Sequence, residues 1–179
     1  MRVFVAVEIS DSDVISSIVD LQSKIKIKAK PVLPQNLHFT LQFLGEISED
    51  KVERIRHALK SIKFSPFKIK FKGLGTFPNM RSPKVVWIGT DDEGAEILSG
   101  LAEKVENLLM PIGFTSDKPF KSHLTIFRIK NKIGNVSKEL EKFESYDFGT
   151  QEISGIKLKQ SILTPQGPLY SDIEVIKAR

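Results

Sequence analysis

The chain has 179 residues, 40% hydrophobic and 27% charged, which is typical of a soluble globular protein with one good-sized core. The absence of cysteine excludes disulfides, thiolate metal sites and thiol nucleophiles, and no apolar run approaches the roughly 20 residues that span a bilayer. Lysine and arginine outnumber aspartate and glutamate by 27 to 22, which favours a polyanionic partner. No signal peptide follows Met1, so we expect a cytoplasmic protein.

Hydrophobic alternation predicts half-buried strands, and apolar residues three and four apart predict amphipathic helices. Helix starts are marked by N-cap residues, and prolines mark the ends. In the first half of the chain the expected elements are a strand over Val3–Val7, a helix from Ser10 that ends before Pro31, a strand over Leu37–Leu44, a helix from Ser48 to Ile62, and a strand over Phe67–Leu74.

The second half shows the same mixture of patterns. Its expected elements are a strand over Val85–Ile88, a helix over Ile97–Leu109, a strand over Ser122–Ile129, a short helix over Ser137–Phe143, and a hairpin of Ile153–Leu163 with Leu169–Ile176. No long linker or low-complexity stretch divides the chain. We therefore predict an α+β fold with mainly antiparallel sheet, in a single domain of residues 1–179.

Two of the three histidines lie in the same local pattern. His38–Leu41 and His123–Ile126 each read His, apolar, Thr, apolar, and each histidine has a proline four residues before it, Pro34 or Pro119. Residues i and i+2 of a strand point to the same face, so each motif presents an imidazole and a hydroxyl side by side. An internal duplication, with two lobes facing across a cleft, would bring these matching half-sites together.

Such a pair suits the hydrolysis of a cyclic phosphodiester. Water must lose a proton as it attacks phosphorus, and the leaving oxygen must gain one on the opposite side. Histidines are suited to both transfers near neutral pH, so His38 and His123 are the candidate catalytic pair. The hydroxyls of Thr40 and Thr125 are expected to bind the phosphate, with Lys121 as a nearby cation. This chemistry requires no metal.

Other residues near the motifs have less specific interpretations. His57 falls off the apolar stripe of its helix and is expected to be a solvated residue without a role. Phe39 and Phe43 share the strand phase of the core. Phe127 shares the phase of His123, which makes it the candidate for contacting a base.

With these motifs in place, the sequence resembles the two-histidine (2H) phosphoesterase superfamily, in particular its 2′-5′ RNA ligase / RNA 2′,3′-cyclic phosphodiesterase family. The resemblance covers nearly the whole chain and rests on six segments: Phe4–Ile9, Asn36–Gly45, Gly73–Pro78, Val85–Gly89, Pro119–Ile126 and Ser161–Tyr170. Relatives often have proline and arginine where this chain has Ser122 and Lys121, and lysine lacks the bidentate fork of arginine.

The resemblance implies a bilobal fold of two antiparallel-rich sheets with flanking helices, related by pseudo-two-fold symmetry around a central cleft. It implies hydrolysis of RNA 2′,3′-cyclic phosphates to 2′-phosphates, and in some members reversible 2′-5′ RNA ligation without a nucleotide cofactor. By the same analogy His38 donates a proton to the 3′ leaving oxygen and His123 activates water. We expect a monomer, with no metal, cofactor or membrane, acting on RNA ends that include tRNA fragments.

Two other readings compete with this one. A non-catalytic RNA- or nucleotide-binding module on the same fold would not need a matched pair of proton-transfer groups. A two-histidine metal site would need supporting ligands, but neither motif has a carboxylate in phase, and no His-x-x-x-His pair occurs. Gly73–Gly75 is not followed by the Lys-Ser/Thr of a phosphate-binding loop, so ATP- or GTP-dependent chemistry has no support.

Overall fold

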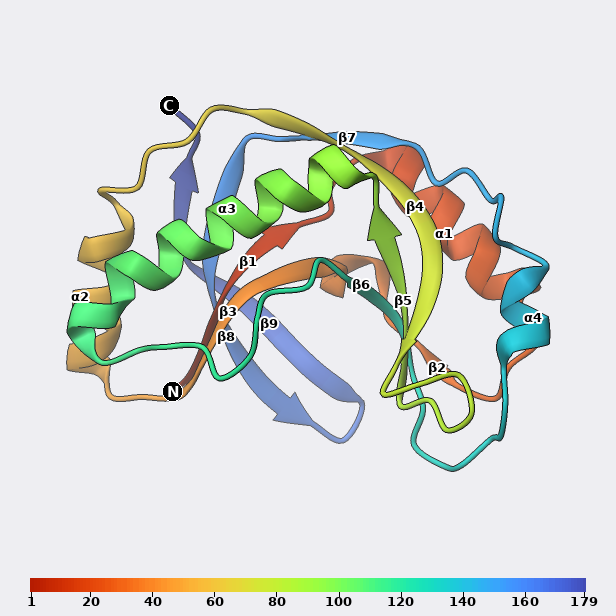
Figure 1. Cartoon of the computed structure of the whole chain (residues 1–179). Coiled ribbons are helices and arrows are strands. Elements are labelled where there is room, and N and C mark those ends of the chain that lie inside the picture. Colours follow the sequence, from red (N-terminus) through yellow and green to blue (C-terminus); the bar gives the residue numbers. More distant parts are fainter.

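The computed structural model describes residues 1–179 and contains nine strands and four α-helices (Figure 1). Two short 3₁₀ turns, η1 and η2, complete the regular structure. In chain order the elements are β1 (Arg2–Glu8), α1 (Ser12–Lys24), β2 (Lys30–Pro31), η1 (Pro34–Asn36), β3 (His38–Glu46), α2 (Glu49–Leu59), β4 (Phe67–Phe77), β5 (Val85–Thr90), α3 (Asp92–Leu109), η2 (Met110–Ile112), β6 (Leu124–Arg128), α4 (Ser137–Glu141), β7 (Thr150–Ile153), β8 (Gly155–Thr164) and β9 (Gly167–Lys177).

The strands form two antiparallel sheets of matching design. One has the order β3-β1-β8-β9 and the other β2-β6-β5-β4-β7. Apart from the two-residue strand β2, each sheet begins with a histidine-motif strand (β3 or β6). Next to it lies the strand that precedes a long helix (β1 or β5). The predicted α+β class with two antiparallel-rich sheets and pseudo-two-fold symmetry is confirmed.

The helices α1 and α3 each follow a strand of one sheet and contact the other sheet. The helix α1 follows β1 but lies beside β2 and β6, where the Gln22 amide donates to the carbonyl oxygens of Val32 and Ile126 at 3.1 and 2.8 Å. At its start, the backbone N–H of Asp11 donates to the Gln151 side chain of β7 at 3.0 Å. The helix α3 follows β5 and contacts β3 of the other sheet as well as β4 and β5. The two sheets are therefore tied together by the helices.

One hydrophobic core of 37 buried residues joins both sheets and the helices. Val3, Val5 and Val7 of β1 are all 1% exposed or less, as the alternation predicts. Phe4 and Ala6 on the other face of β1 are buried too, so the strand is covered on both sides. Since burying a large apolar side chain contributes about 1.5–3 kcal/mol, this core fixes the strands that carry the histidines. None of the helices combines the length and the apolar character needed to cross a membrane.

The structure differs from the sequence patterns at sheet edges and at one helix start. The strands β2 and β7 have two and four residues, which is too short to show alternation. The predicted strand over Ile153–Leu163 is divided at Ser154, where the chain passes from one sheet to the other. The helix α3 begins earlier than predicted because the Asp91 side chain caps it, accepting from the backbone N–H of Gly94 at 3.1 Å.

Candidate active site

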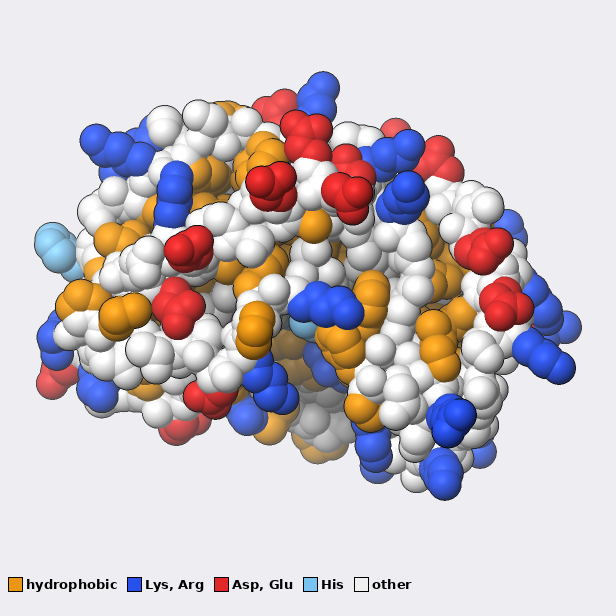
Figure 2. Space-filling model, in the orientation of Figure 1, with side chains coloured by type: hydrophobic (Ala, Val, Ile, Leu, Met, Phe, Trp, Pro, Cys, Tyr) orange, Lys and Arg blue, Asp and Glu red, His pale blue; other side chains and the backbone are white.

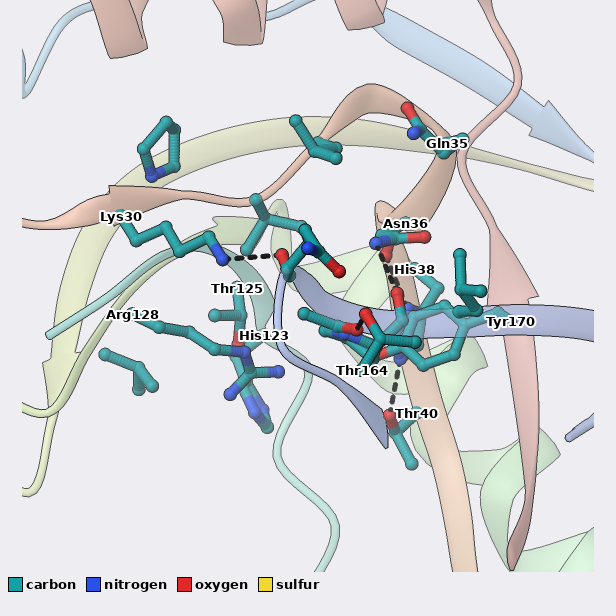
Figure 3. A pocket seen from close by; sticks show the side chains of 18 residues that line it. Lys30, Gln35, Asn36, His38, Thr40, His123, Thr125, Arg128, Thr164 and Tyr170 are labelled. Carbon is teal, nitrogen blue, oxygen red and sulfur yellow. Dashed lines mark hydrogen bonds between the residues drawn. The ribbon is translucent and has the colours of Figure 1, made fainter. Parts of the chain in front are cut away.

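Both histidine motifs open into one cleft of about 550 Å³, lined by residues of both sheets (Figure 3). His38 and Thr40 reach it from β3. Thr125 reaches it from β6, and His123 reaches it from the position just before β6. The expectation that the two half-sites meet in a central cleft is therefore confirmed. The lining consists of Lys30, Pro31, Val32, Leu33, Gln35, Asn36, His38, Thr40, Val85, His123, Thr125, Arg128, Thr164, Gln166, Gly167, Pro168, Leu169 and Tyr170, with no Asp or Glu among them.

A β-bulge lies at the last residue of each histidine motif. The register of β1 with β3 skips Leu41, and the register of β5 with β6 skips Ile126. Each skipped residue is the third after its histidine. Because a bulge places two residues of one strand opposite a single residue of its partner, the side chains beyond it exchange faces. Strict alternation therefore assigns the wrong face to the residues that follow each motif.

The bulges correct two predictions about aromatic residues. Phe127 lies in the core with 3% exposure and does not line the cleft, so the prediction that it contacts a base is wrong. Phe43, which alternation assigns to the core, is instead 57% exposed. Its cross-strand partner is Phe4, whose ring centroid lies 5.0 Å from that of His38. Directly opposed residues share a sheet face, so Phe43 is the exposed aromatic residue on the face of His38.

The same exchange of faces turns Arg128 into the cleft (Figure 3). Lys121, the cation predicted for the phosphate, is not a lining residue. Its ammonium lies 5.2 and 5.1 Å from the ring centroids of Phe77 and Trp87. The strand β6 begins only after His123, so strand alternation does not place Lys121 on the face of His123. The sequence patterns did not identify Arg128 as a site residue. It lies five residues after His123, just as Phe43 lies five residues after His38, and this equal spacing could have indicated it.

His38 is held in one tautomer and packs against two aromatic rings. Its Nδ1 lies 2.7 Å from the carbonyl oxygen of Asn36. A carbonyl only accepts, so Nδ1 carries the proton and donates. Nε2 of the neutral ring then accepts from the Thr40 hydroxyl at 3.1 Å. The centroids of Phe4 and Tyr170 lie 5.0 and 5.3 Å from the imidazole. The proton-transfer nitrogen of His38 is thus Nε2, beside the threonine.

His123 repeats this arrangement in the second half-site. Its Nδ1 donates to the carbonyl oxygen of Lys121 at 2.8 Å, so Nε2 is again the nitrogen without a proton in the neutral ring. Two aromatic rings pack around it, Phe77 with its centroid at 4.9 Å and Trp87 at 6.4 Å. Each half-site therefore holds its imidazole by a backbone carbonyl on one side and two aromatic residues on the other.

Burial lowers the pKa of His38 to about 4, and the positive charges of Lys159 and Arg128 act in the same direction. The hydrogen bond to the Asn36 carbonyl and the charge of Glu8 oppose this shift. Burial is also the main cause that lowers the pKa of His123. At neutral pH His38 is therefore uncharged in the free protein.

An ion cluster lies on the His38 side of the cleft and has no counterpart beside His123. Lys159 is only 5% exposed, and its ammonium lies 2.5 Å from Glu8 and 3.0 Å from Asp172. Lys157 contacts the same two carboxylates at 3.1 and 2.8 Å. Glu8 is the cross-strand partner of His38. Because both lysines neutralise it, this carboxylate stands beside His38 without bonding to it.

The tip of the β8–β9 hairpin reaches across the mouth of the cleft to the other sheet. The Lys30 ammonium donates to the carbonyl oxygen of Gln166 at 2.7 Å (Figure 3). Asn36 also donates to the carbonyl oxygen of Pro168, at 3.4 Å.

No group of three or more His, Cys, Asp or Glu side chains that could hold a metal ion occurs in the chain. The cleft therefore offers two imidazoles, the hydroxyls of Thr40 and Thr125, and two cations for an anionic ligand.

Known proteins are similar to this chain in sequence and in fold. The protein named RNA 2′,3′-cyclic phosphodiesterase from Archaeoglobus fulgidus is 46% identical, over 99% of this chain and 100% of its own. The protein of that name from Methanocaldococcus jannaschii is 41% identical, over 99% of both chains. The crystal structure of TT0787 of Thermus thermophilus has a TM-score of 0.79 and 29% identity, covering 100% of this chain and 98% of the other.

Two further comparisons bear on the architecture. Escherichia coli LigT complexed with 3′-AMP has a TM-score of 0.78 over 99% of this chain and 97% of its own, and at 22% identity it shows the shared fold. The family model described as LigT like Phosphoesterase matches this chain twice, over residues 7–87 and 88–170. The two consecutive matches agree with the duplicated half-sites and sheets. They show, together with the full-length relatives, that this chain belongs to the LigT-like phosphoesterase family.

Proposed function

We propose that this protein hydrolyses 2′,3′-cyclic phosphates at RNA ends to 2′-phosphates by metal-independent acid–base catalysis. The observation that carries the proposal is the pair of half-sites in one cleft, where His38 and His123 each have an Nδ1–H fixed by a backbone carbonyl and an unprotonated Nε2. Two proton-transfer groups facing one phosphate are what an in-line displacement at phosphorus requires. The relatives named RNA 2′,3′-cyclic phosphodiesterase agree with this chemistry.

In the reaction that we propose, His123 Nε2 takes a proton from water as its oxygen bonds to phosphorus. The bond from phosphorus to O3′ breaks on the opposite side, and protonated His38 gives its Nε2 proton to that oxygen. The product is a 2′-phosphate with a free 3′-hydroxyl. A 5′-hydroxyl in place of water would form a 2′-5′ bond, so the same pair would also serve RNA ligation.

The cleft supplies positive charge and donors to the phosphate. Arg128 can present two parallel N–H groups to two phosphate oxygens, and Thr125 adds a hydroxyl donor. The Thr40 hydroxyl becomes a further donor once His38 is protonated and no longer accepts its proton. Because no carboxylate lines the cleft, nothing there repels an anion. Fixed donors of this kind stabilise the charge that develops on phosphoryl oxygens in the transition state.

The low pKa of His38 has a consequence for its role as the proton donor. At about 4, most of His38 is neutral before substrate binds. The cyclic phosphodiester carries one negative charge, and an adjacent anion favours the charged imidazole. We therefore expect substrate binding to raise the pKa of His38 and to draw in the proton that the leaving oxygen later receives.

The terminal base can stack on Phe43, which lies further along β3 than the residues that line the cleft. Phe43 is 57% exposed on the face of β3 that carries His38 and Thr40, and Arg2 lies over its ring with 5.6 Å to the centroid. Stacking on an aromatic side chain accepts every base, so little sequence preference is expected. Both half-sites come from one chain, so a monomer is sufficient for activity. We expect cytoplasmic RNA ends, tRNA fragments among them, to be the substrates.

The test uses a short RNA that ends in a 2′,3′-cyclic phosphate, incubated with a strong chelator and without nucleotide. His38→Ala and His123→Ala should each lower the rate by about 10²-fold or more, because each removes one proton transfer. His57→Ala is the matched control, since that histidine is exposed on α2 and lies outside the cleft. The position of the product phosphate should be determined by mass spectrometry or NMR.

The expected outcome is a 2′-phosphate from the wild type and from His57→Ala, with both cleft variants folded but inactive. Binding of the RNA without any turnover by the wild type would favour the non-catalytic module on the same fold. Loss of activity in the chelator, restored by a divalent metal, would instead favour a metal-dependent site.

A further inference from the structure

The acidic residues are unevenly distributed around the cleft. Four long stretches of the chain contain no Asp or Glu at all: residues 21–45, 54–90, 118–138 and 153–171. Between them they contribute every residue that lines the cleft. Acidic side chains gather on other elements, such as α3 and α2. Figure 2 shows red side chains along the upper edge, over α3, and blue ones at the lower right.

Two of the acid-free stretches lie side by side at the end of the five-stranded sheet. The turn between β4 and β5 packs against the segment after β6, where the backbone N–H of Ile129 donates to the carbonyl oxygen of Lys84 at 2.8 Å. Further along, the N–H of Val136 donates to the carbonyl oxygen of Met80 at 3.0 Å. Both segments lie together at the lower right of Figure 1.

Four cations project from these two segments: Arg81, Lys84, Lys130 and Lys132, which together form what we call the basic rim. All four are exposed, and none takes part in an ion pair. Some lysines elsewhere do have acidic partners, as Lys24 does with Asp20 and Lys142 with Glu139. The positive charge of the basic rim is therefore not neutralised within the protein.

The basic rim is continuous with the cleft. Arg128, which lines the cleft, is followed after one buried residue by Lys130 on the same chain segment. On its other side Arg128 is the cross-strand partner of Lys30, a second cleft residue. A row of cations thus leads from the phosphate site outward over the end of the sheet.

We propose that the basic rim binds the RNA strand that leads to the terminal cyclic phosphate, by contacting the phosphates upstream of the reacting nucleotide. This rests on the proposed function of the cleft. A nucleotide that ends in a 2′,3′-cyclic phosphate continues only from its 5′ side, so one strand must leave the cleft. The exit toward the rim offers that strand unpaired cations and no carboxylate.

The side chains of the basic rim are suited to bind a single RNA strand through its phosphates. Lysine and arginine bind phosphates without distinguishing bases, and the release of counterions makes such binding salt-dependent, with a slope of about −0.7 per phosphate on single strands. The four rim residues do not line the cleft, so they add affinity for a polynucleotide without touching the reacting atoms. The rim therefore makes RNA a better substrate than a free cyclic mononucleotide.

The experiment compares a mononucleotide with an eight-nucleotide RNA, each ending in a 2′-phosphate so that no turnover occurs during binding. The variant Arg81→Gln with Lys84→Gln removes two rim charges. The variant Lys51→Gln with Arg54→Gln removes one lysine and one arginine from α2, at the far side of the molecule, and is the matched control. Affinity is measured by calorimetry between 50 and 200 mM salt, and turnover is measured separately with the cyclic substrates.

The wild type and the control should bind the octamer more tightly than the mononucleotide. The rim variant should bind the octamer about tenfold more weakly near 0.1 M salt, with a salt slope that is shallower by about 1.4. Its kcat/KM on the cyclic mononucleotide should stay within about twofold of the wild type, since its cleft is unchanged.

Three results would overturn the proposal. These are equal affinity for the two lengths, equal octamer affinity in the rim and control variants, or loss of mononucleotide turnover in the rim variant. The second result would direct attention to an acidic protein surface as the partner of the rim. Tight, rim-dependent binding of the octamer without cleavage of the cyclic phosphate would leave the rim in place and reject the proposed catalysis instead.

Discussion

His38 and His123 share a motif and a tautomer, but their neighbours differ. Glu8 lies opposite His38 in the register of β1 with β3. In β5 the matching position, one residue beyond the Ile88–Leu124 pair, is Gly89, which has no side chain. Only His38 therefore has a carboxylate as a cross-strand neighbour. The two half-sites are alike in the atoms that face the phosphate and different in the charges behind them.

This difference predicts opposite pH shifts for two substitutions. Besides burial, the charge of Lys159 lowers the pKa of His38 and that of Glu8 raises it. Lys159→Met should therefore raise the pKa of His38, and Glu8→Gln should lower it, with Arg128 left in place in both. If His38 is the acid, activity requires its protonated form. The alkaline limb of the pH–rate profile should then move to higher pH in Lys159→Met and to lower pH in Glu8→Gln.

The control for these shifts is the double variant, which removes both charges and should return the limb toward its wild-type position. Each single variant leaves the remaining member of the cluster with another partner, because Lys157 still contacts Glu8 and Asp172 still contacts Lys159. Thermal unfolding checks that the fold persists. A limb that moves in the same direction in both single variants would count against an electrostatic role of the cluster.

The exchange of Lys121 for Arg128 as the phosphate cation is testable in the same assay. Arg128→Gln should lower kcat/KM by about 10²-fold or more, because it removes a preorganised charged donor from the cleft. Lys121→Gln should have a small effect, since its ammonium lies over Phe77 and Trp87 outside the cleft. The measurement is steady-state hydrolysis of the cyclic phosphate, and a larger effect at Lys121 than at Arg128 would reverse the assignment.

Most elements were predictable from the sequence, and the exceptions have a common cause. The strand that begins at His38 and the helix that ends at Leu109 show clear periodicity, since one face of each is buried. The faces of Phe43 and Phe127 were not predictable, because a bulge depends on which residues the partner strand places opposite. The catalytic candidates precede the bulges, so their shared face followed from the motif alone.

A close contact between β4 and β5 holds the aromatic support of His123. Gly75 lies against the Trp87 indole, and a Cβ on this glycine would come within 2.2 Å of Cζ2. Gly75→Ala should therefore displace the indole, with a cost in stability of about 1–3 kcal/mol and a lower kcat/KM. The matched control is Gly100→Ala on the exposed face of α3, where a Cβ meets nothing within 4 Å.

The two alanine variants should change stability in opposite directions, because alanine is the better helix former at Gly100 by about 1 kcal/mol. Urea unfolding gives the free energies, and hydrolysis of the cyclic phosphate gives the activity. Unchanged stability and activity in Gly75→Ala would mean that Trp87 relocates freely and does not position His123.

For the whole molecule, the core that spans both sheets predicts one cooperative unfolding transition. The 37 buried residues form one cluster, and α3 contacts β3 in one sheet and β4 and β5 in the other. Neither lobe has a separate core, so both should melt together in calorimetry, with agreement between calorimetric and van't Hoff enthalpies. Two resolved transitions would show that the lobes are independent domains. The sequence indicated the duplication, but the crossing of helices between sheets depends on long-range packing that no local pattern records.

The crossing of elements between the two sheets bears on how the molecule arose. The repeats at residues 7–87 and 88–170 are not the two lobes, since β4 of the first repeat joins the sheet of β6, and β8 of the second joins the sheet of β3. A chain with one repeat would complete its sheets only by exchanging strands with a second copy. Such a strand-swapped dimer would hold two identical histidines on either side of its two-fold axis. With both repeats in one chain the equivalent positions can carry different residues, as Glu8 and Gly89 or Phe43 and Arg128 do.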